Sequence, residues 1–177
     1  MSTDAHAFRD ALRLFPAGVT LVTMRSGETV HGLTVSAFAS VSPEPPLVAI
    51  LIDHQHRAHE LLQRPGATFA ANVLGEEQRA LADRFAWMDD EARFGAGEWT
   101  TALTGAPILV DALAWLDCTL HSQHAAGSHT LYIGRVEACG TPRPGALPLV
   151  YWNRDYRRLA RDPESAAQNA AQVPPAE

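Results

Sequence analysis

The sequence is short of the features that mark several common classes of protein. It has only two cysteines, Cys118 and Cys139, so no disulfide framework is expected. Cys118 falls in the apolar phase of a strand-like run, which predicts a buried thiol. No apolar run is long enough to cross a membrane, and the first residues lack the basic region and apolar stretch of a secretory signal. We therefore expect a soluble, cytoplasmic protein.

The chain also lacks an excess of positive charge. Its formal net charge is −6, so it would gain little from neutralising a phosphate backbone, and nucleic acid is not an expected partner. Hydrophobic residues make up 46% of the 177 residues, which is enough to bury the core of one domain. The segment after Leu159 has neither aromatic residues nor a sizeable apolar face. We expect a folded domain over residues 1–159 and a disordered tail over 160–177.

Several catalytic motifs are missing as well. The sequence contains no G-x-G-x-x-G loop, G-x-S-x-G elbow, H-E-x-x-H pair or C-x-x-C pair, which disfavours a Rossmann dinucleotide site and the hydrolase and zinc classes. Histidines are numerous at eight, but His121 and His124 would point to opposite faces of one strand. His54 and His56 could share a face but have no partner at a ligand-like spacing. We expect no metal site, and a histidine-rich metal-binding domain remains a third interpretation.

What is present is a series of strand-like segments with a few helices between them. β-branched and apolar runs predict strands at residues 19–25, 33–42, 47–52, 68–74, 114–124, 129–139 and 147–152. Helical spacing predicts helices over residues 8–15, 57–63 and 74–85, and residues 86–106 resemble a long surface loop. These elements predict a mainly β fold with peripheral helices, either a barrel or a sandwich.

One strand-like stretch, "LTVSAFASVS" from Leu33 to Ser42, has an unusual pattern. If it is a single strand, one face is a plain core face of small apolar residues: Val35, Ala37, Ala39 and Val41. The other face carries short hydroxyls around Phe38 and no charge: Thr34, Ser36, Ser40 and Ser42. An ordinary solvated face would carry charged residues, so the hydroxyl row raises the question of a ligand.

Five segments, taken in order, resemble one known family. They read "FPAGVTLVT", "HGLTVSAFASVSPEPPLV", "FAANVL", "LADRFA" and "GSHTLYIGRVEA". The stretch from Phe8 to Tyr156 is similar to the FMN-binding split-barrel flavin reductases, which are NAD(P)H:flavin oxidoreductase components of two-component monooxygenases. Each motif alone is weak, but all of them occur in order at matching spacing.

The resemblance implies a split β-barrel that reduces FMN or FAD by hydride transfer from NADH or NADPH. It also implies a homodimer with flavin near the subunit interface, and a monooxygenase partner served by diffusible reduced flavin. A non-catalytic flavin-binding module is the alternative that the sequence leaves open.

The resemblance further implies where the ligands would lie. The flavin contacts would come from residues in three regions: Thr34, Val35, Ser36, Ala37, Ser40, Val41, Ser42, Asp53, His56, Arg57, His59 and Phe85. Ser36, Ser40 and Arg57 are the candidates for donors to a phosphate. His129 would position the nicotinamide.

The sequence departs from the family pattern at three places. Ser36 stands where asparagine is usual, and Ser128 where aspartate is common. In the segment "DHQHRAHELL", His56 and Ala58 replace hydroxyl residues. A phosphate there would meet imidazole and guanidinium groups instead.

Overall fold

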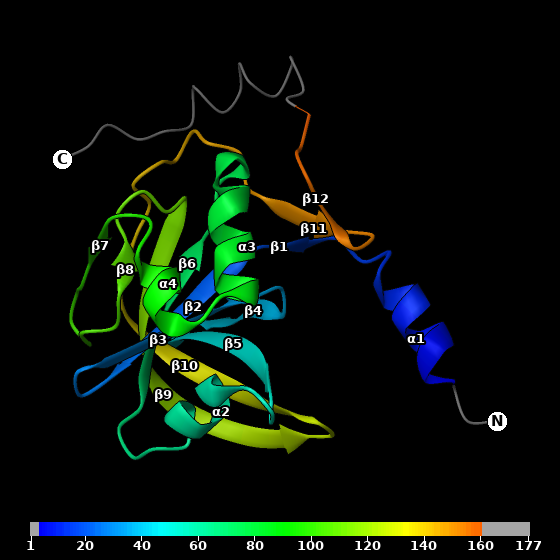
Figure 1. The fold of residues 1–177 in the computed structure, drawn as a ribbon. Helices are drawn as coiled ribbons and strands as arrows, with labels where there is room; N and C mark the ends of the chain where they lie inside the picture. The colour runs from blue at the N-terminus through cyan, green and yellow to red at the C-terminus, as the bar shows by residue number, and fades with distance from the viewer. Residues whose placement is uncertain (1–3, 161–177) are drawn as a thin grey trace.

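A computed structural model describes residues 4–160, and its main element is a seven-stranded antiparallel sheet (Figure 1). The strands lie in the order β3-β2-β6-β9-β10-β5-β4. Their bounds are β2 Thr20–Ser26, β3 Thr29–Val35, β4 Phe38–Pro43, β5 Pro46–Asp53, β6 Thr68–Val73, β9 Ala114–Ala126 and β10 His129–Gly140. The prediction of a mainly β fold with peripheral helices is confirmed.

The two edge strands of this sheet, β3 and β4, are neighbours in the chain. Only Ser36 and Ala37 separate them. A residue step spans about 3.8 Å, so the Cα atoms of Val35 and Phe38 can be at most about 11 Å apart. The sheet must therefore curl until its first and last strands approach each other. The covalent connection through Ser36 and Ala37 closes this barrel, because β3 and β4 do not pair with each other.

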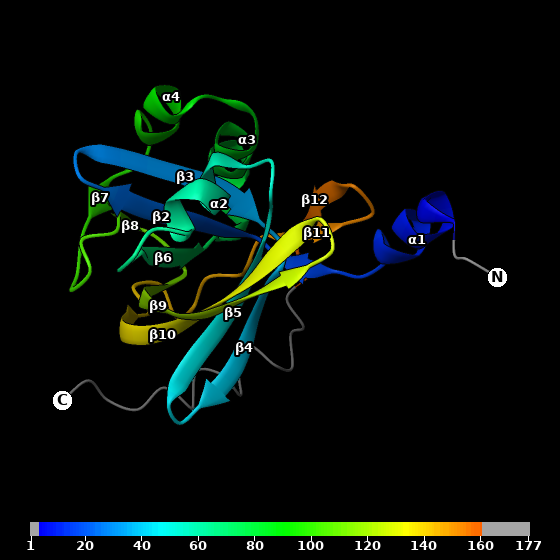
Figure 2. The ribbon, with the colours of Figure 1, turned by 90° about the horizontal axis from the view of Figure 1, so that it is seen from below.

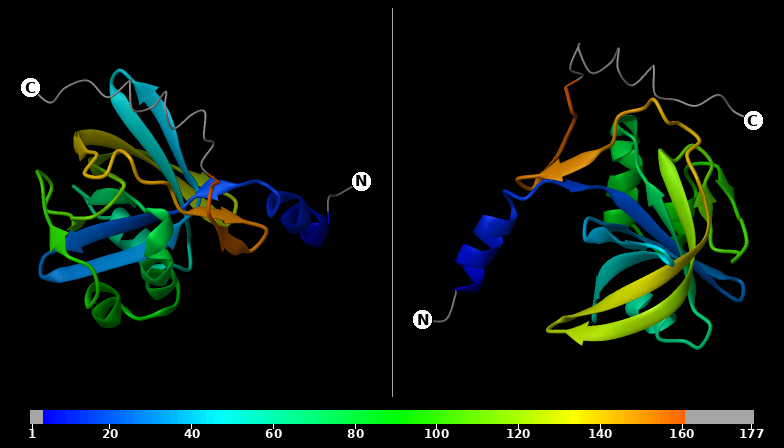
Figure 3. Two further views of the ribbon diagram at one scale, coloured as in Figure 1. Left: turned by 90° about the horizontal axis from the view of Figure 1, so that it is seen from above. Right: turned by 180° about the vertical axis from the view of Figure 1, so that it is seen from behind.

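Helices cover the sheet on two sides. Helix α2 (Arg57–Leu62) follows β5, while the 3-10 turn η1 (Glu76–Gln78), α3 (Arg79–Trp87) and α4 (Asp90–Phe94) follow β6. Two short pairings complete the body: β7 (Trp99–Thr100) with β8 (Ile108–Leu109), and β1 (Ala17–Gly18) with the hairpin of β11 (Val150–Trp152) and β12 (Asp155–Arg157). Helix α1 (Ala5–Leu12) extends away from the body, as does the β4–β5 hairpin (Figures 2 and 3).

The core has two main parts. One lies inside the curled sheet, where Phe69 and Tyr132 are fully buried beside Leu62 of α2. The other lies under α3, where the fully buried Phe85 stacks edge-on against Phe94 and packs on Trp99. Full burial of such a side chain stabilises the fold by roughly 1.5–3 kcal/mol, so both parts hold the helices on the sheet.

Most of the predicted elements are confirmed, with small shifts at their ends. Exceptions lie at residues 33–42, 74–85, 86–106 and 147–152. Residues 86–106 are not one irregular loop, because α4 and β7 form there and place Phe94 and Trp99 on Phe85. The predicted helix over 74–85 begins later, after η1, and the last predicted strand is shortened to β11. The buried thiol of Cys118 is confirmed, and burial raises its pKa to about 12.

The prediction of one strand over residues 33–42 is wrong. The chain leaves β3 after Val35 and joins β5 as β4, so the alternation of faces restarts at the crossing. Phe38 consequently packs on the core, while Ala39 and Val41 are exposed. A register shift between Ser40 and Ser42 changes the alternation once more, as a β-bulge does.

The expected division into a domain over 1–159 and a tail over 160–177 stays a prediction, because all but the first residue of that tail lies outside the described part. Within residues 4–160, no helix combines the length and the apolar character needed to cross a membrane.

Gly134 of the "YIGRV" segment marks a close approach inside the barrel. A Cβ atom there would overlap the ring of Phe69 and meet the Cβ of Cys118 at 3.1 Å. We predict that Gly134→Ala lowers the free energy of unfolding by about 1–3 kcal/mol, the usual cost of overpacking. Urea unfolding would measure it. Gly145→Ala is the control, since no atom lies within 4 Å of the added methyl group; equal stability of the two variants would contradict this packing argument.

Candidate functional site

The crossing between β3 and β4 leaves a break in the sheet at which backbone and small side chains are accessible. Ser36 and Ala37 are both exposed there. The carbonyl of Ala37 accepts a hydrogen bond from the amide of Leu51 at 3.2 Å, which ties the crossing to β5. A flat ring system can approach such a backbone closely because no large side chain intervenes.

The four hydroxyls of the "LTVSAFASVS" stretch have different roles. Thr34 donates to the carbonyl of Ala82 in α3 at 2.7 Å, so its hydroxyl holds the helix on the sheet. The Ser42 hydroxyl donates to the carbonyl of Glu44 and accepts from its amide, which stabilises the hairpin turn. Ser36 and Ser40 are exposed, and their hydroxyls have no hydrogen-bond partner among the described residues, so these hydroxyls are available to a ligand.

Two of the predicted flavin residues have inaccessible side chains. Val35 is 5% exposed and belongs to the core inside the sheet, and Phe85 is 0% exposed beneath α3. A ligand could reach only the backbone of Val35. The side chain of Phe85 supports the site from below, because it packs directly against Gly32 of β3.

A second group surrounds the end of β5. Asp53 lies opposite His129 in the pairing of β5 with β10. The amide of Gln55 donates to Asp53 at 2.9 Å, and this bond, with the nearby imidazoles of His129 and His56, lowers the pKa of the Asp53 carboxyl. The ring of His129 is half-buried, with Nδ1 2.9 Å from the hydroxyl of Ser128. The strand register thus places His129 opposite Asp53, and the turn after β5, in which the His56 amide donates to the Asp53 carbonyl at 3.0 Å, adds His56.

The α2 helix carries the remaining predicted contacts. His56 is exposed at its N-cap position, and its side chain forms no capping bond. His59 is half-buried, with Nδ1 2.6 Å from the hydroxyl of Tyr132 and its ring 4.7 Å from that of His54. The imidazole of His59 is therefore held by the core, whereas that of His56 is free to contact a ligand.

Arg57 has a partner that the sequence did not indicate. Its guanidinium donates to Asp90, the first residue of α4, at 3.1 Å. Asp90 also accepts from Arg93 at 2.9 Å and lies 2.6 Å from Nδ1 of the buried His31. With one carboxylate between two guanidinium groups, this cluster retains positive charge beside α2.

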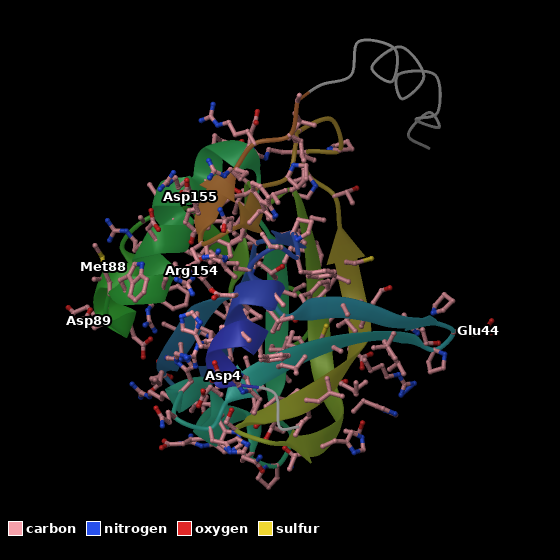
Figure 4. The ribbon with its side chains drawn as sticks, turned by 90° about the vertical axis from the view of Figure 1, so that its right-hand side faces the viewer. Asp4, Glu44, Met88, Asp89, Arg154 and Asp155 are labelled. Carbon is pink, nitrogen blue, oxygen red and sulfur yellow. The ribbon has the colours of Figure 1, made fainter. Side chains whose placement is uncertain are left out.

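Two adjoining cavities lie beside the crossing between β3 and β4, and none of residues 53–59 lines them. The first, of about 340 Å³, is bounded by β3, α3 and the β11–β12 hairpin and includes Thr34, Ser36 and Trp87. The second, of about 470 Å³, lies between α1 and the crossing. Both include Ser36, Tyr151 and Arg154. Figure 4 shows Arg154 and Asp155 on the same side of the molecule as the end of α3 at Met88.

Sequence reasoning missed Trp87, Tyr151, Arg154 and Asp90. The sequence held one signal for the hairpin that carries Tyr151 and Arg154: Asn153 follows a predicted strand and is a typical residue of a tight hairpin turn. Within residues 4–160, no three histidine, cysteine, aspartate or glutamate side chains are grouped as metal ligands would be.

Comparison with known proteins assigns the family. The model of the flavin reductase like domain matches residues 12–160, which is most of the chain. This chain belongs to that family. The flavin reductase domain is 38% identical to the NADH-dependent flavin reductase StyB of Pseudomonas fluorescens over 157 residues, covering 86% of this chain and 89% of StyB. It is 39% identical to the 4-hydroxyphenylacetate 3-monooxygenase reductase component of Thermus thermophilus, covering 86% and 95% of the two chains.

A solved structure supports the same assignment. The Streptomyces globisporus NADH:FAD oxidoreductase SgcE6, in complex with NAD and FAD fragments, superposes with a TM-score of 0.83 at 33% identity. The match covers 90% of this flavin reductase domain and 95% of SgcE6. The predicted split-barrel fold is confirmed by this likeness.

The buried His31 gives the flavin reductase domain a predictable pH dependence. Burial lowers the pKa of His31 in spite of the adjacent Asp90. As the pH falls through about 6.5, the unfolded chain takes up this proton before the folded protein does, so stability falls. We predict that urea unfolding from about pH 8 to about pH 5 shows this loss, and that His31→Gln removes part of it. Parallel pH profiles for the two proteins would contradict this.

Proposed function

We propose that this protein is an NAD(P)H-dependent flavin reductase that reduces FMN or FAD by hydride transfer. The match of the flavin reductase like domain across residues 12–160 carries the proposal. The relatives support it, since their names include NADH-dependent flavin reductase and FMN reductase (NADH). The described residues also fit a flavin, because the break in the sheet presents small side chains and unused hydroxyl donors.

The flavin ring would lie against the crossing, beside Ser36 and Ala37, with Ser40 as a further donor. Its ribityl phosphate would extend past Asp53 toward the start of α2. There His56 and Arg57 supply donors to the phosphate, and Asp90 orients the Arg57 guanidinium. Val41 and Ser42 would shape the edge of this site, and His59 would support it from the core side.

A bound flavin would supply the hydride acceptor and a bound nicotinamide the hydride. The protein must hold the two rings with the reacting atoms roughly 3–3.5 Å apart and keep water out. His129 suits the positioning of the nicotinamide, because its half-buried ring is held by the Ser128 hydroxyl. His129 also lies opposite Asp53 on the neighbouring strand. No protein group has to transfer a proton for the hydride step.

The proposal includes a homodimer with the flavin near the subunit interface. Helix α1 extends from the body, and large apolar side chains on it and just after it are exposed, including Phe8, Leu12 and Phe15. A second copy that covered this face would bury them. Reduced flavin would then diffuse to a monooxygenase partner, as the reductase-component names of the relatives suggest. A cytoplasmic location is also proposed, and the free thiols of Cys118 and Cys139 agree with it.

The function is tested by following NADH and NADPH oxidation with free FMN or FAD under saturating conditions. We expect oxidation of the nicotinamide well above the rate without protein, and anaerobic bleaching of the flavin band. Stoichiometric flavin binding without nicotinamide oxidation would contradict the reductase proposal. That outcome would favour the non-catalytic flavin-binding module.

His129 provides a sharper test of the site. If it positions the nicotinamide, His129→Ala should slow flavin reduction or raise the KM for NAD(P)H by one or two powers of ten, roughly 1.4–2.7 kcal/mol. The Kd for flavin should hardly change. Stopped-flow reduction beside a melting curve would measure both effects, with His124→Ala in the exposed β9 end as the control. Unchanged kinetics at every NAD(P)H concentration would remove His129 from the site.

A further inference from the structure

A buried histidine lies behind the arginine that we expect to meet the flavin phosphate. The side chain of His31, on β3, is 6% exposed, and its Nδ1 lies 2.6 Å from Oδ1 of Asp90. The other oxygen of Asp90 accepts from the Arg57 guanidinium at 3.1 Å. One carboxylate therefore connects an imidazole inside the protein to a guanidinium at the proposed phosphate position.

The two arginines that share Asp90 differ in how firmly they are held. Arg93 is 15% exposed and donates both to Asp90, at 2.9 Å, and to the backbone carbonyl of Gly32, at 2.8 Å. The side chain of Arg57 is 55% exposed, and within residues 4–160 it bonds to Asp90 alone. A ligand can therefore draw Arg57 away, while Arg93 keeps the carboxylate in place beside His31.

Neither ring nitrogen of His31 is satisfied. Nδ1 is close to Asp90 without meeting the geometry of a hydrogen bond, and Nε2 has no partner among the described residues. Burial lowers the pKa of His31, against the opposing effect of Asp90. The ring is therefore mostly neutral near pH 7 and has an unused capacity to accept a proton.

The charged groups that face His31 come from two helices. Asp90 and Arg93 lie on α4, and Arg57 lies on α2. On β2 the register partner of His31 is the buried, uncharged Met24. Helix α3 contacts the following residues of β3 through apolar and backbone groups. The imidazole thus responds to one carboxylate and two guanidinium groups, and a further negative charge beside Arg57 would favour its protonated form.

We propose that His31 takes up a proton from solvent when a phosphate binds at Arg57, so that FMN binding and protonation of His31 are linked. The inference rests on the phosphate position proposed above. A phosphate dianion that pairs with Arg57 competes with Asp90 for the guanidinium donors and adds negative charge to the cluster. Asp90 then gains a charged partner in the imidazolium of His31. His31 is thus a positioning residue that acts on the ligand through Asp90 and Arg57.

The sign of the linkage follows from its reciprocity. If bound FMN favours the protonated ring, then a lower pH favours bound FMN. The Kd for FMN should fall as the pH is lowered toward the pKa of His31 in the free protein, by at most about tenfold per pH unit, because one proton is involved.

Calorimetric titration with FMN in two buffers of different ionisation enthalpy measures the protons taken up on binding. At about pH 6.5 we expect the native protein to take up a larger fraction of a proton per FMN than His31→Gln does. Both proteins meet the same ligand, so titration of the phosphate itself, with a pKa of about 6, enters both measurements. Riboflavin, which has the same ring system without the phosphate, should bind with no difference between the two proteins.

A second variant tests the connection without changing the buried ring. Asp90→Asn removes the carboxylate that joins His31 to Arg57, so it should lose the same part of the proton uptake. Glu91→Gln is the matched control, because Glu91 follows on α4, is exposed and forms no ion pair among the described residues. His56→Gln tests the rival source, the exposed imidazole at the start of α2, and should retain the difference.

Proton uptake that persists in both His31→Gln and Asp90→Asn would overturn the proposal, and so would uptake that only His56→Gln removes. Failure of FMN to bind, or an equal His31-dependent uptake with riboflavin, would also overturn it. The titration needs no nicotinamide, so it is independent of the reductase assay. A protein that binds FMN with this uptake but oxidises no nicotinamide keeps the inference and loses the reductase function. A reductase without the uptake keeps the function and loses the inference.

Discussion

The passage of the chain from one edge of the sheet to the other in two residues is the constraint on which this structure depends. Strands β3 and β4 are at opposite ends of the strand order, yet only Ser36 and Ala37 connect them. A covalent link this short forces the sheet to curl and leaves a break between its edges. The break is where backbone and small side chains become accessible, so the closure of the barrel and the proposed site have the same origin.

The "HGLT" segment, which comes just before the crossing, holds the helices on the edge strand. His31 meets Asp90 of α4, Gly32 leaves room for the ring of Phe85, and Thr34 donates to the carbonyl of Ala82. A Cβ atom on Gly32 would lie 2.6 Å from the Phe85 ring. This segment therefore fixes α3 and α4 on the edge strand, and only the residues after it are free for a ligand.

Local patterns in the sequence predicted most of the strands, because alternation and β-branched runs report burial directly. They failed at the crossing, since a change of partner strand leaves no mark on a pattern of small apolar and hydroxyl residues. They also failed at α4 and β7, where the burial of Phe94 and Trp99 depends on distant Phe85. For the proposed site, the resemblance suggested segments but could not indicate what each side chain contacts: the hydroxyls of Thr34 and Ser42 bond within the fold, and Arg57 is held by Asp90.

The central claim is that the break at Ser36 and Ala37 receives the flavin ring. Amide hydrogen exchange with and without FMN tests it most directly, because it reports each backbone segment separately. The account predicts that FMN slows amide exchange over residues 34–42 and 53–59. It predicts little change in the β7–β8 pair or in α3. Protection confined to other segments, with residues 34–42 exchanging as before, would contradict it.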